Sequence, residues 1–176
     1  KEKLNYIIGN PPFIGARLMN KEQKESLLAV FDGYKGAGNL DFVSGWYMKC
    51  AKIMKESCIK AALVSTNSIT QGEQAAILWK ILMEDFGTKI HFAYQTFQWT
   101  SEAKQKAAVY CVIIGFSNLD SVQKILFDTS NLANEVENIN GYLVDAPSVF
   151  ISNRTKPISN ITKMVFGNMP NDGGFL

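Results

Sequence analysis

The sequence has few of the residues that hold disulfide-rich or metal-stabilised domains together. Its 176 residues include three cysteines and one histidine. Cys50, Cys58 and Cys111 have no CxxC spacing, and their odd number leaves one unpaired. This pattern favours a reduced, cytoplasmic protein over a disulfide framework and gives no support for a zinc site, so we expect no metal.

Long apolar runs are also missing. None reaches the roughly 18 to 20 residues that span a bilayer, so we expect no membrane partner. Residues 1–12 carry lysines before a short apolar stretch, but no small-residue cleavage site follows, which argues against a signal peptide. The chain begins at Lys1 rather than methionine, and we expect it to be part of a longer protein.

Neither sign of charge is in large excess. The net charge is +2 and the sequence pI is about 8.4, which neither diagnoses nor excludes a nucleic-acid surface. With 47% hydrophobic and 19% charged residues, the composition is that of an ordinary globular protein. The length suits one domain, or one domain and part of another.

Apolar periodicity predicts alternating strands and helices in the first part of the chain. Strands are predicted at 4–9, 60–68, 89–99, 107–117 and 124–128, and helices at 20–31, 40–57 and 72–87. Asn20 is the expected cap of the first helix and Gly87 the expected end of the last. In the helix over 40–57, we expect Phe42, Trp46, Cys50, Ile53 and Met54 to face a sheet.

Strand, helix, strand, helix and then a run of strands is the order of an α/β protein. It predicts the C-terminal half of an open Rossmann-like sheet, mixed in direction and with an antiparallel edge strand. After residue 128 the chain becomes polar and rich in Asn, Pro and Gly. We therefore predict one domain over 1–128 and a connector over 129–176 that leads into another module.

The first predicted strand ends in the sequence Asn10-Pro11-Pro12-Phe13. Proline fixes its own φ and pushes the preceding residue toward extended backbone, so these four residues form a stiff loop. In an open α/β sheet, ligands bind at the carboxyl ends of the strands. The Asn10 side-chain oxygen and a proline-restricted carbonyl can accept both hydrogens of a planar NH2 group, and the Phe13 ring offers a stacking surface. The alternative is a purely structural turn that ends the strand.

This loop resembles the (Asn/Asp/Ser)-Pro-Pro-aromatic signature of the S-adenosyl-L-methionine-dependent amino-methyltransferases. The resemblance implies that Asn10, Pro11, Pro12 and Phe13 are catalytic, with methyl transfer to the exocyclic amine of adenine. The substrate would be duplex DNA, with the target base flipped out of the helix. A carbon-5 cytosine enzyme would need a Pro-Cys nucleophile, and no cysteine here follows a proline.

Four longer stretches are similar to the methyltransferase region of the bifunctional type II, MmeI-like restriction–modification enzymes: 10–17, 39–54, 97–116 and 170–176. These enzymes hold their cofactor through a glycine-rich loop, and the single G-x-G here, at 36–38, follows no predicted strand. The resemblance therefore implies a catalytic-loop half that is inactive alone. Its partners would be the rest of a parent chain, with a cofactor-binding half, a target-recognition domain and, in this family, a nuclease.

The same resemblance suggests further site residues. Phe97 and Trp99 would form a second aromatic wall against the flipped base, although ordinary sheet packing explains them more simply. Asn39 and Asp41 would bind the cofactor, and a helix-capping role for Asn39 is an equal alternative. Asn67, at a strand end, either lines the pocket or begins a turn.

Basic residues and the lone histidine complete the candidates. His91 lies on an alternating strand and is more simply a satisfied structural residue than a base. Contacts to DNA phosphate are expected from Lys104, Lys106, Arg154, Lys156 and Lys163, with a solvated surface as the alternative.

Two other functions remain compatible with the residues. The same four-residue loop occurs in enzymes that methylate RNA or a protein glutamine. A catalytically idle recognition or scaffold module is the alternative from another class.

Overall fold

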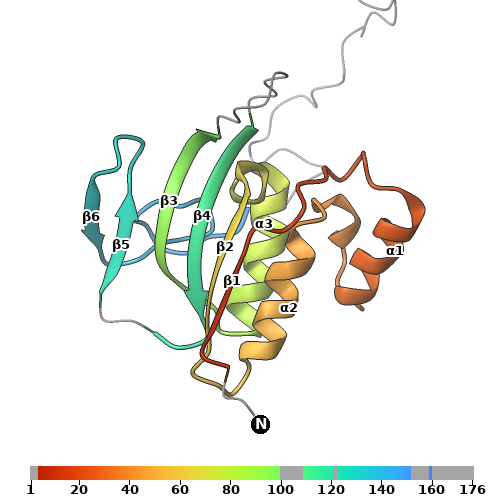
Figure 1. The fold of residues 1–176 in the computed structure, drawn as a ribbon, viewed down its shortest axis with the longest axis horizontal. Helices are drawn as coiled ribbons and strands as arrows, with labels where there is room; N and C mark the ends of the chain where they lie inside the picture. The colour runs from red at the N-terminus through yellow and green to blue at the C-terminus, as the bar shows by residue number, and fades with distance from the viewer. Residues whose placement is uncertain (1–3, 100–108, 121–122, 152–158, 160–176) are drawn as a thin grey trace, which may run out of the picture.

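A computed structural model describes residues 4–99, 109–120, 123–151 and 159 (Figure 1). Six strands form one sheet in the order β1-β2-β4-β3-β5-β6. The strands are β1 (Tyr6–Gly9), β2 (Lys60–Thr66), β3 (Lys89–Trp99), β4 (Val109–Ser117), β5 (Lys124–Phe127) and β6 (Ala133–Val136). The helices are α1 (Lys21–Val30), α2 (Ser44–Met54) and α3 (Gly72–Lys80), with short turns η1 (Ala37–Asn39), η2 (Asn67–Thr70) and η3 (Ile81–Asp85).

The sheet is mixed, as the sequence predicts. Strands β1, β2, β3 and β5 run in one direction, while β4 and β6 run in the other. The antiparallel edge strand is β6, and β4 is a second antiparallel strand inside the sheet. Because parallel strands end at the same edge, the residues that follow β1, β2 and β3 all lie at one edge of the sheet.

The main core lies between the sheet and helices α2 and α3, which cover one face (Figure 1). Tyr47 on α2 stacks on Phe116 of β4 at a centroid distance of 5.1 Å, and Trp79 on α3 meets the same ring edge-on at 6.4 Å. Their polar atoms are satisfied: the Tyr47 hydroxyl lies 2.5 Å from Ser65 Oγ, and Trp79 Nε1 donates to the Ile69 carbonyl at 3.0 Å. This core fixes the direction in which both helices start at the carboxyl edge of β2.

Helix α2 is shorter than the range 40–57, and the face predicted for it is partly wrong. It ends where Lys55 becomes extended and Glu56 adopts a φ of 56°. Ile53 is exposed, and Phe42 lies before the helix. Cys50 and Met54 are buried as predicted, whereas the other fully buried residues of α2 are Ser44, Tyr47, Met48 and Ala51. The spacing of the aromatic residues therefore predicts a stripe displaced from the one that packs, which includes the small residues Ser44 and Ala51.

Other helix boundaries agree with the sequence. Asn20 caps α1 through a capping box: its side-chain oxygen accepts from the Gln23 amide, and Gln23 Oε1 accepts from the Asn20 amide. Gly87, with a φ of 66°, ends the segment that α3 and η3 form. No helix within the described residues is long and apolar enough to cross a membrane.

Part of the chain after residue 128 packs on the same sheet. Strand β6 pairs with β5, and Ile139 and Leu143 are buried in the main core. Gly141 lies against Trp79, so closely that a Cβ atom at Gly141 would stand 2.6 Å from the Trp79 Cβ. Polar composition hid this segment, because its apolar side chains that pack on the core are few and scattered among polar residues.

Gly141→Ala should destabilise the fold. The added methyl group would overlap the buried Trp79 side chain at its Cβ, which cannot move without the helix, and such overpacking costs about 1 to 3 kcal/mol. We expect a lower urea midpoint for this chain by tryptophan fluorescence. The control is Gly38→Ala, whose nearest neighbour is the mobile end of Lys24 at 3.7 Å. Equal midpoints for the two variants would show that the 139–143 segment adjusts without cost.

Candidate active site

The Asn10 to Phe13 loop begins directly after β1, at the carboxyl edge of the sheet. Asn10 and Pro12 are exposed, Pro11 is buried and Phe13 is half-buried. The buried proline anchors the loop while the Asn10 side chain is left accessible. This is the arrangement that a loop needs if it is to present hydrogen-bond acceptors to an incoming group.

The segment after the loop is held by the approach to α2. The Ile14 carbonyl accepts from the Phe42 amide at 2.9 Å, and the Ala16 amide donates to Asp41 Oδ1 at 2.8 Å. Asp41 also accepts from Ser68 Oγ at 2.5 Å and from Gln74 Nε2 at 3.1 Å. One carboxylate, only 8% exposed, thus joins three segments that are distant in sequence.

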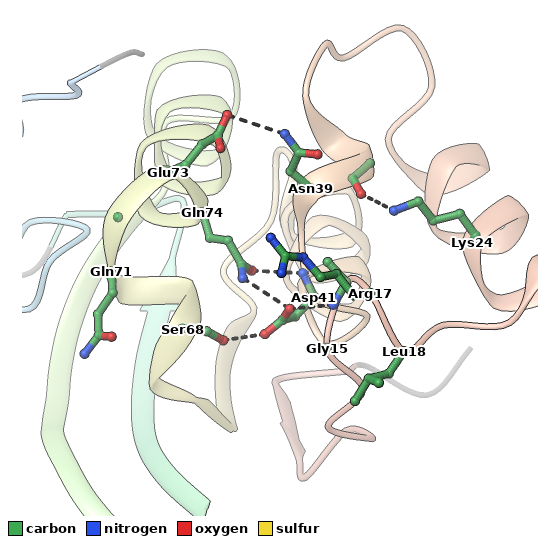
Figure 2. A pocket seen from close by; sticks show the side chains of 13 residues that line it. Gly15, Arg17, Leu18, Lys24, Asn39, Asp41, Ser68, Gln71, Glu73 and Gln74 are labelled. Carbon is green, nitrogen blue, oxygen red and sulfur yellow. Dashed lines mark hydrogen bonds between the residues drawn. The ribbon is translucent and has the colours of Figure 1, made fainter. Parts of the chain in front are cut away.

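A cavity of about 980 Å³ opens beside this junction (Figure 2). It lies between the segment after Phe13, helix α1, turns η1 and η2, and the first turn of α3. Its charged and amide side chains are those of Arg17, Lys24, Asn39, Asp41, Gln71, Glu73 and Gln74. Lys24 donates to the Gly38 carbonyl, and Asn39 Nδ2 donates to Glu73 Oε1 at 3.4 Å. The four residues Asn10 to Phe13 are not among its lining.

Both residues predicted to bind a cofactor, Asn39 and Asp41, line this cavity. The capping alternative for Asn39 is wrong, because it ends η1 and the N-cap of α2 is Val43. Asn67 begins η2, where its carbonyl accepts from Thr70 Oγ1 at 2.8 Å, so it starts a turn.

Phe97 and Trp99 lie at the carboxyl end of β3, at the same edge of the sheet as Asn10 but three strands away, about 14 Å at the backbone. Their ring centroids are 6.4 Å apart, Phe97 is half-buried and Trp99 is 46% exposed. They pair with Cys111 and Val109, which alternate with the residues of β4 that face the helices. The aromatic pair therefore lies on the opposite face of the sheet from α3.

A β-bulge sets the direction of this pair. Between Tyr94 and Phe97 the register of β3 shifts by one residue against β4. Without the bulge, Tyr94 and Phe97 would point to opposite faces, since side chains alternate along a strand. The extra residue places both on one face, next to the Tyr94–Phe127 stack, whose centroids are 4.1 Å apart.

Comparison with known proteins decides the family. Residues 1–128 match the family model described as the MmeI DNA-methyltransferase domain. The chain belongs to this family. It is 48% identical over 174 residues to DNA methyltransferase A of Bacillus subtilis (strain 168), which covers 97% of the chain and 19% of that protein.

The solved structure of the type IIL restriction–modification enzyme MmeI in complex with DNA also matches. The TM-score is 0.90 at 47% identity, over 97% of this chain and 23% of that one. The chain thus spans about a fifth of the length of the relatives it matches. The family implies a methyl donor. The cavity fits part of such a molecule, because Arg17 and Lys24 can meet a carboxylate while Glu73 and Asn39 can meet an ammonium or hydroxyl group.

Sequence reasoning missed several residues that line the cavity of this methyltransferase domain. Ser68 lies in η2 just after β2, Gln71 precedes α3 and Gln74 lies in its first turn. The available signal was position: small polar residues that end a strand and open the next helix gather at the carboxyl edge. The predicted phosphate contacts Lys104, Lys106, Arg154, Lys156 and Lys163 lie outside the described residues.

His91 is a structural residue near the opposite edge of the sheet. Its Nε2 lies 2.9 Å from the Leu119 carbonyl, which can only accept, and 3.0 Å from Ser117 Oγ. Burial lowers the pKa of His91 below its ordinary value of 6.5, against the opposing effect of the Leu119 carbonyl. Of the nearby charges, Lys60 and Lys124 lower this pKa further and Asp120 raises it.

This lowered pKa predicts a stability that depends on pH. Since the folded state binds the His91 proton less well than the unfolded chain, its contribution is complete above about pH 6.5 and falls as the pH drops toward the folded-state pKa. His91→Gln should remove this component from the unfolding free energy between about pH 7 and pH 5, measured by urea denaturation. If the unfolding free energies of the wild-type protein and His91→Gln depended on pH in the same way, the lowered pKa of His91 would be contradicted.

Proposed function

We propose that this chain is the catalytic-loop part of a DNA methyltransferase that acts in restriction–modification. We assign adenine as the target base, its exocyclic amine as the acceptor and S-adenosyl-L-methionine as the donor. The observation that carries the proposal is the Asn10 to Phe13 loop, which directly follows a strand at the carboxyl edge of a sheet in a chain of the MmeI methyltransferase family.

In the proposed mechanism, the Asn10 side-chain oxygen and the Pro11 carbonyl each accept one hydrogen of the target amine. This holds the amine in one plane and directs its lone pair out of that plane, toward the methyl group. S-Adenosyl-L-methionine, when bound, supplies an electrophilic methyl group. Pro12 restricts the loop, and Phe13 stacks on the base, which has been flipped out of the duplex. The amine then gives up one proton to water, so no side chain of this loop needs to act as a base.

The remaining site residues have supporting roles in this proposal. Asn39, in the wall of the cavity, contacts the donor. Half-buried Phe97 and exposed Trp99, at the same sheet edge, contact the displaced base or the DNA beside it. The Phe97–Trp99 pair lies about 14 Å from β1 at the backbone. Bound DNA must therefore span the space between this pair and Phe13.

The exposed edge strand β1 is the second observation that supports a longer functional protein. Among the residues that the structure describes, strand β1 pairs with β2 alone, and its Tyr6 and Ile8 are 64% and 82% exposed. Unpaired edge strands with apolar side chains are normally covered. We propose that the cofactor-binding half of a longer cytoplasmic protein covers this edge. Residues 129–176, after packing on the sheet as far as Leu143, would connect 1–128 to a target-recognition domain, and a nuclease domain would complete such a protein.

Methyl transfer from labelled S-adenosyl-L-methionine tests the function. The full-length protein that contains this sequence would be incubated with unmethylated duplex DNA, and the digested nucleosides would be separated. Label on N6-methyladenine supports the proposal, whereas label on another base would overturn the adenine assignment. Label on RNA or on a protein glutamine would assign the chain to the other enzymes with this loop, and no transfer at all would favour a recognition module.

A further inference from the structure

The Asp41 carboxylate is the most connected polar group beside the proposed active site (Figure 2). Its Oδ1 accepts from the Ala16 amide at 2.8 Å and from Gln74 Nε2 at 3.1 Å, and its Oδ2 accepts from Ser68 Oγ at 2.5 Å. The Asp41 amide donates back to Gln74 Oε1 at 2.9 Å. With both lone pairs of Oδ1 engaged, the group is built to hold protein segments together.

These bonds reach the catalytic loop from its C-terminal side. The Asp41 bond to Ala16, together with the Phe42 amide bond to the Ile14 carbonyl, pins the three residues that follow Phe13. From its other end, the loop is continuous with β1. The loop is therefore fixed at both ends, and Asp41 provides the side-chain part of the second anchor.

The same carboxylate is tied to the neighbouring strand. Ser68 Oγ, which donates to Asp41, lies 2.9 Å from Thr66 Oγ1 at the end of β2. Since β2 pairs in parallel with β1, the chain of bonds from Thr66 to Ala16 sets the loop relative to the strand that carries it. Hydrogen bonds to a charged acceptor are about twice as strong as neutral ones, which suits an anchor that must resist movement.

We propose that Asp41 is a positioning residue for methyl transfer: it acts through the Asn10 to Phe13 loop and does not contact the donor directly. This replaces the expectation from sequence that Asp41 binds the cofactor. The inference rests on the proposed function, because positioning has a kinetic meaning only if the loop holds the target amine.

The test is a double-mutant cycle in the full-length protein with Asp41→Ala, Asn10→Ala and both together. Displacement of a reacting group by about 1 Å costs up to about 100-fold in rate, so we expect Asp41→Ala to lower kcat by about 10- to 100-fold. The KM values for S-adenosyl-L-methionine and for DNA should change by less than about threefold. In the Asn10→Ala background, Asp41→Ala should have almost no further effect on kcat, since the loop it positions has lost its acceptor.

Two matched variants separate positioning from folding. Asp41→Asn keeps an oxygen for the Ala16 amide and can donate to Ser68, so it should recover most of the lost kcat. Asp32→Ala removes an exposed aspartate from the loop after α1 and should leave kcat unchanged. A higher KM for S-adenosyl-L-methionine at constant kcat would identify Asp41 as a donor contact and overturn the proposal. Effects of Asp41→Ala and Asn10→Ala that multiply would overturn it as well.

Hydrogen exchange provides a readout that does not depend on activity. In the wild-type protein the Ala16 amide is protected by Asp41, and a peptide covering 10–18 should exchange faster in Asp41→Ala and near the wild-type rate in Asp41→Asn. If the wild-type protein transfers no methyl group, the proposed function fails, and this exchange still decides whether Asp41 holds the loop. Unchanged exchange in Asp41→Ala would refute the anchor itself.

Discussion

Asn10→Ala is expected to lower kcat for methyl transfer to DNA by at least about 100-fold. The substitution removes one of two acceptors that hold the target amine, and loss of one preorganised hydrogen-bonding group at a reacting centre typically costs 100- to 1,000-fold. Asn10 is exposed and its side chain is not part of the core, so the fold should be retained. The measurement is single-turnover label transfer with the full-length protein and duplex DNA.

The control for this variant is Asn5→Ala. Asn5 is an exposed asparagine directly before β1, at the other end of the same strand, and its replacement should leave kcat unchanged. Asn10→Asp should keep measurable activity, since a carboxylate oxygen also accepts a hydrogen from the amine. Wild-type kcat in Asn10→Ala would show that the loop does not hold the acceptor group, and the mechanism would have to be abandoned.

The position of this loop was predictable because its determinants are local. Two prolines must stop β1, and the apolar run before them must be a strand. The capping box at Asn20 is local in the same sense, since it depends on residues three apart in sequence. Family resemblance added the chemistry, and the match over 1–128 confirms the family.

The surroundings of the loop were not predictable, because they depend on contacts between distant residues. Asp41 lies 25 residues from Ala16, 27 from Ser68 and 33 from Gln74. Nothing in the pattern around Asp41 distinguishes a carboxylate that will bind three protein donors from one that will face a ligand. A role in binding the donor and a role in positioning the loop both require Asp41 to lie near the cavity. Only its hydrogen bonds distinguish the two roles.

Periodicity failed where small residues decide the packing. For α2, Trp46 and the preceding Phe42 suggested the buried stripe, yet the helix packs through Ser44, Ala51 and their neighbours. The bulge before Phe97 is a similar case. One extra residue reverses the face of the side chains that follow it, and no feature of the sequence indicates where the register shifts.

Phe13→Ala is the second substitution for which a large effect is expected. Stacking of a base on an aromatic ring contributes about 1 to 3 kcal/mol, so loss of the ring should lower kcat/KM for DNA by roughly 5- to 150-fold. Phe13→Tyr keeps the ring and should retain activity within a few-fold. The KM for S-adenosyl-L-methionine should stay constant in both variants, because Phe13 does not line the cavity.

A matched phenylalanine separates stacking from packing. Phe86 is also half-buried, but it follows η3 near the opposite edge of the sheet, so Phe86→Ala costs packing energy without touching the proposed base site. We expect Phe86→Ala to lower the thermal midpoint while kcat/KM for DNA stays near the wild-type value. If Phe13→Ala and Phe86→Ala reduce kcat/KM equally, the loss reflects a weaker fold. A loss confined to Phe13→Ala and reversed by tyrosine would instead assign the ring to the flipped base, because only a flat surface beside Asn10 has that dependence.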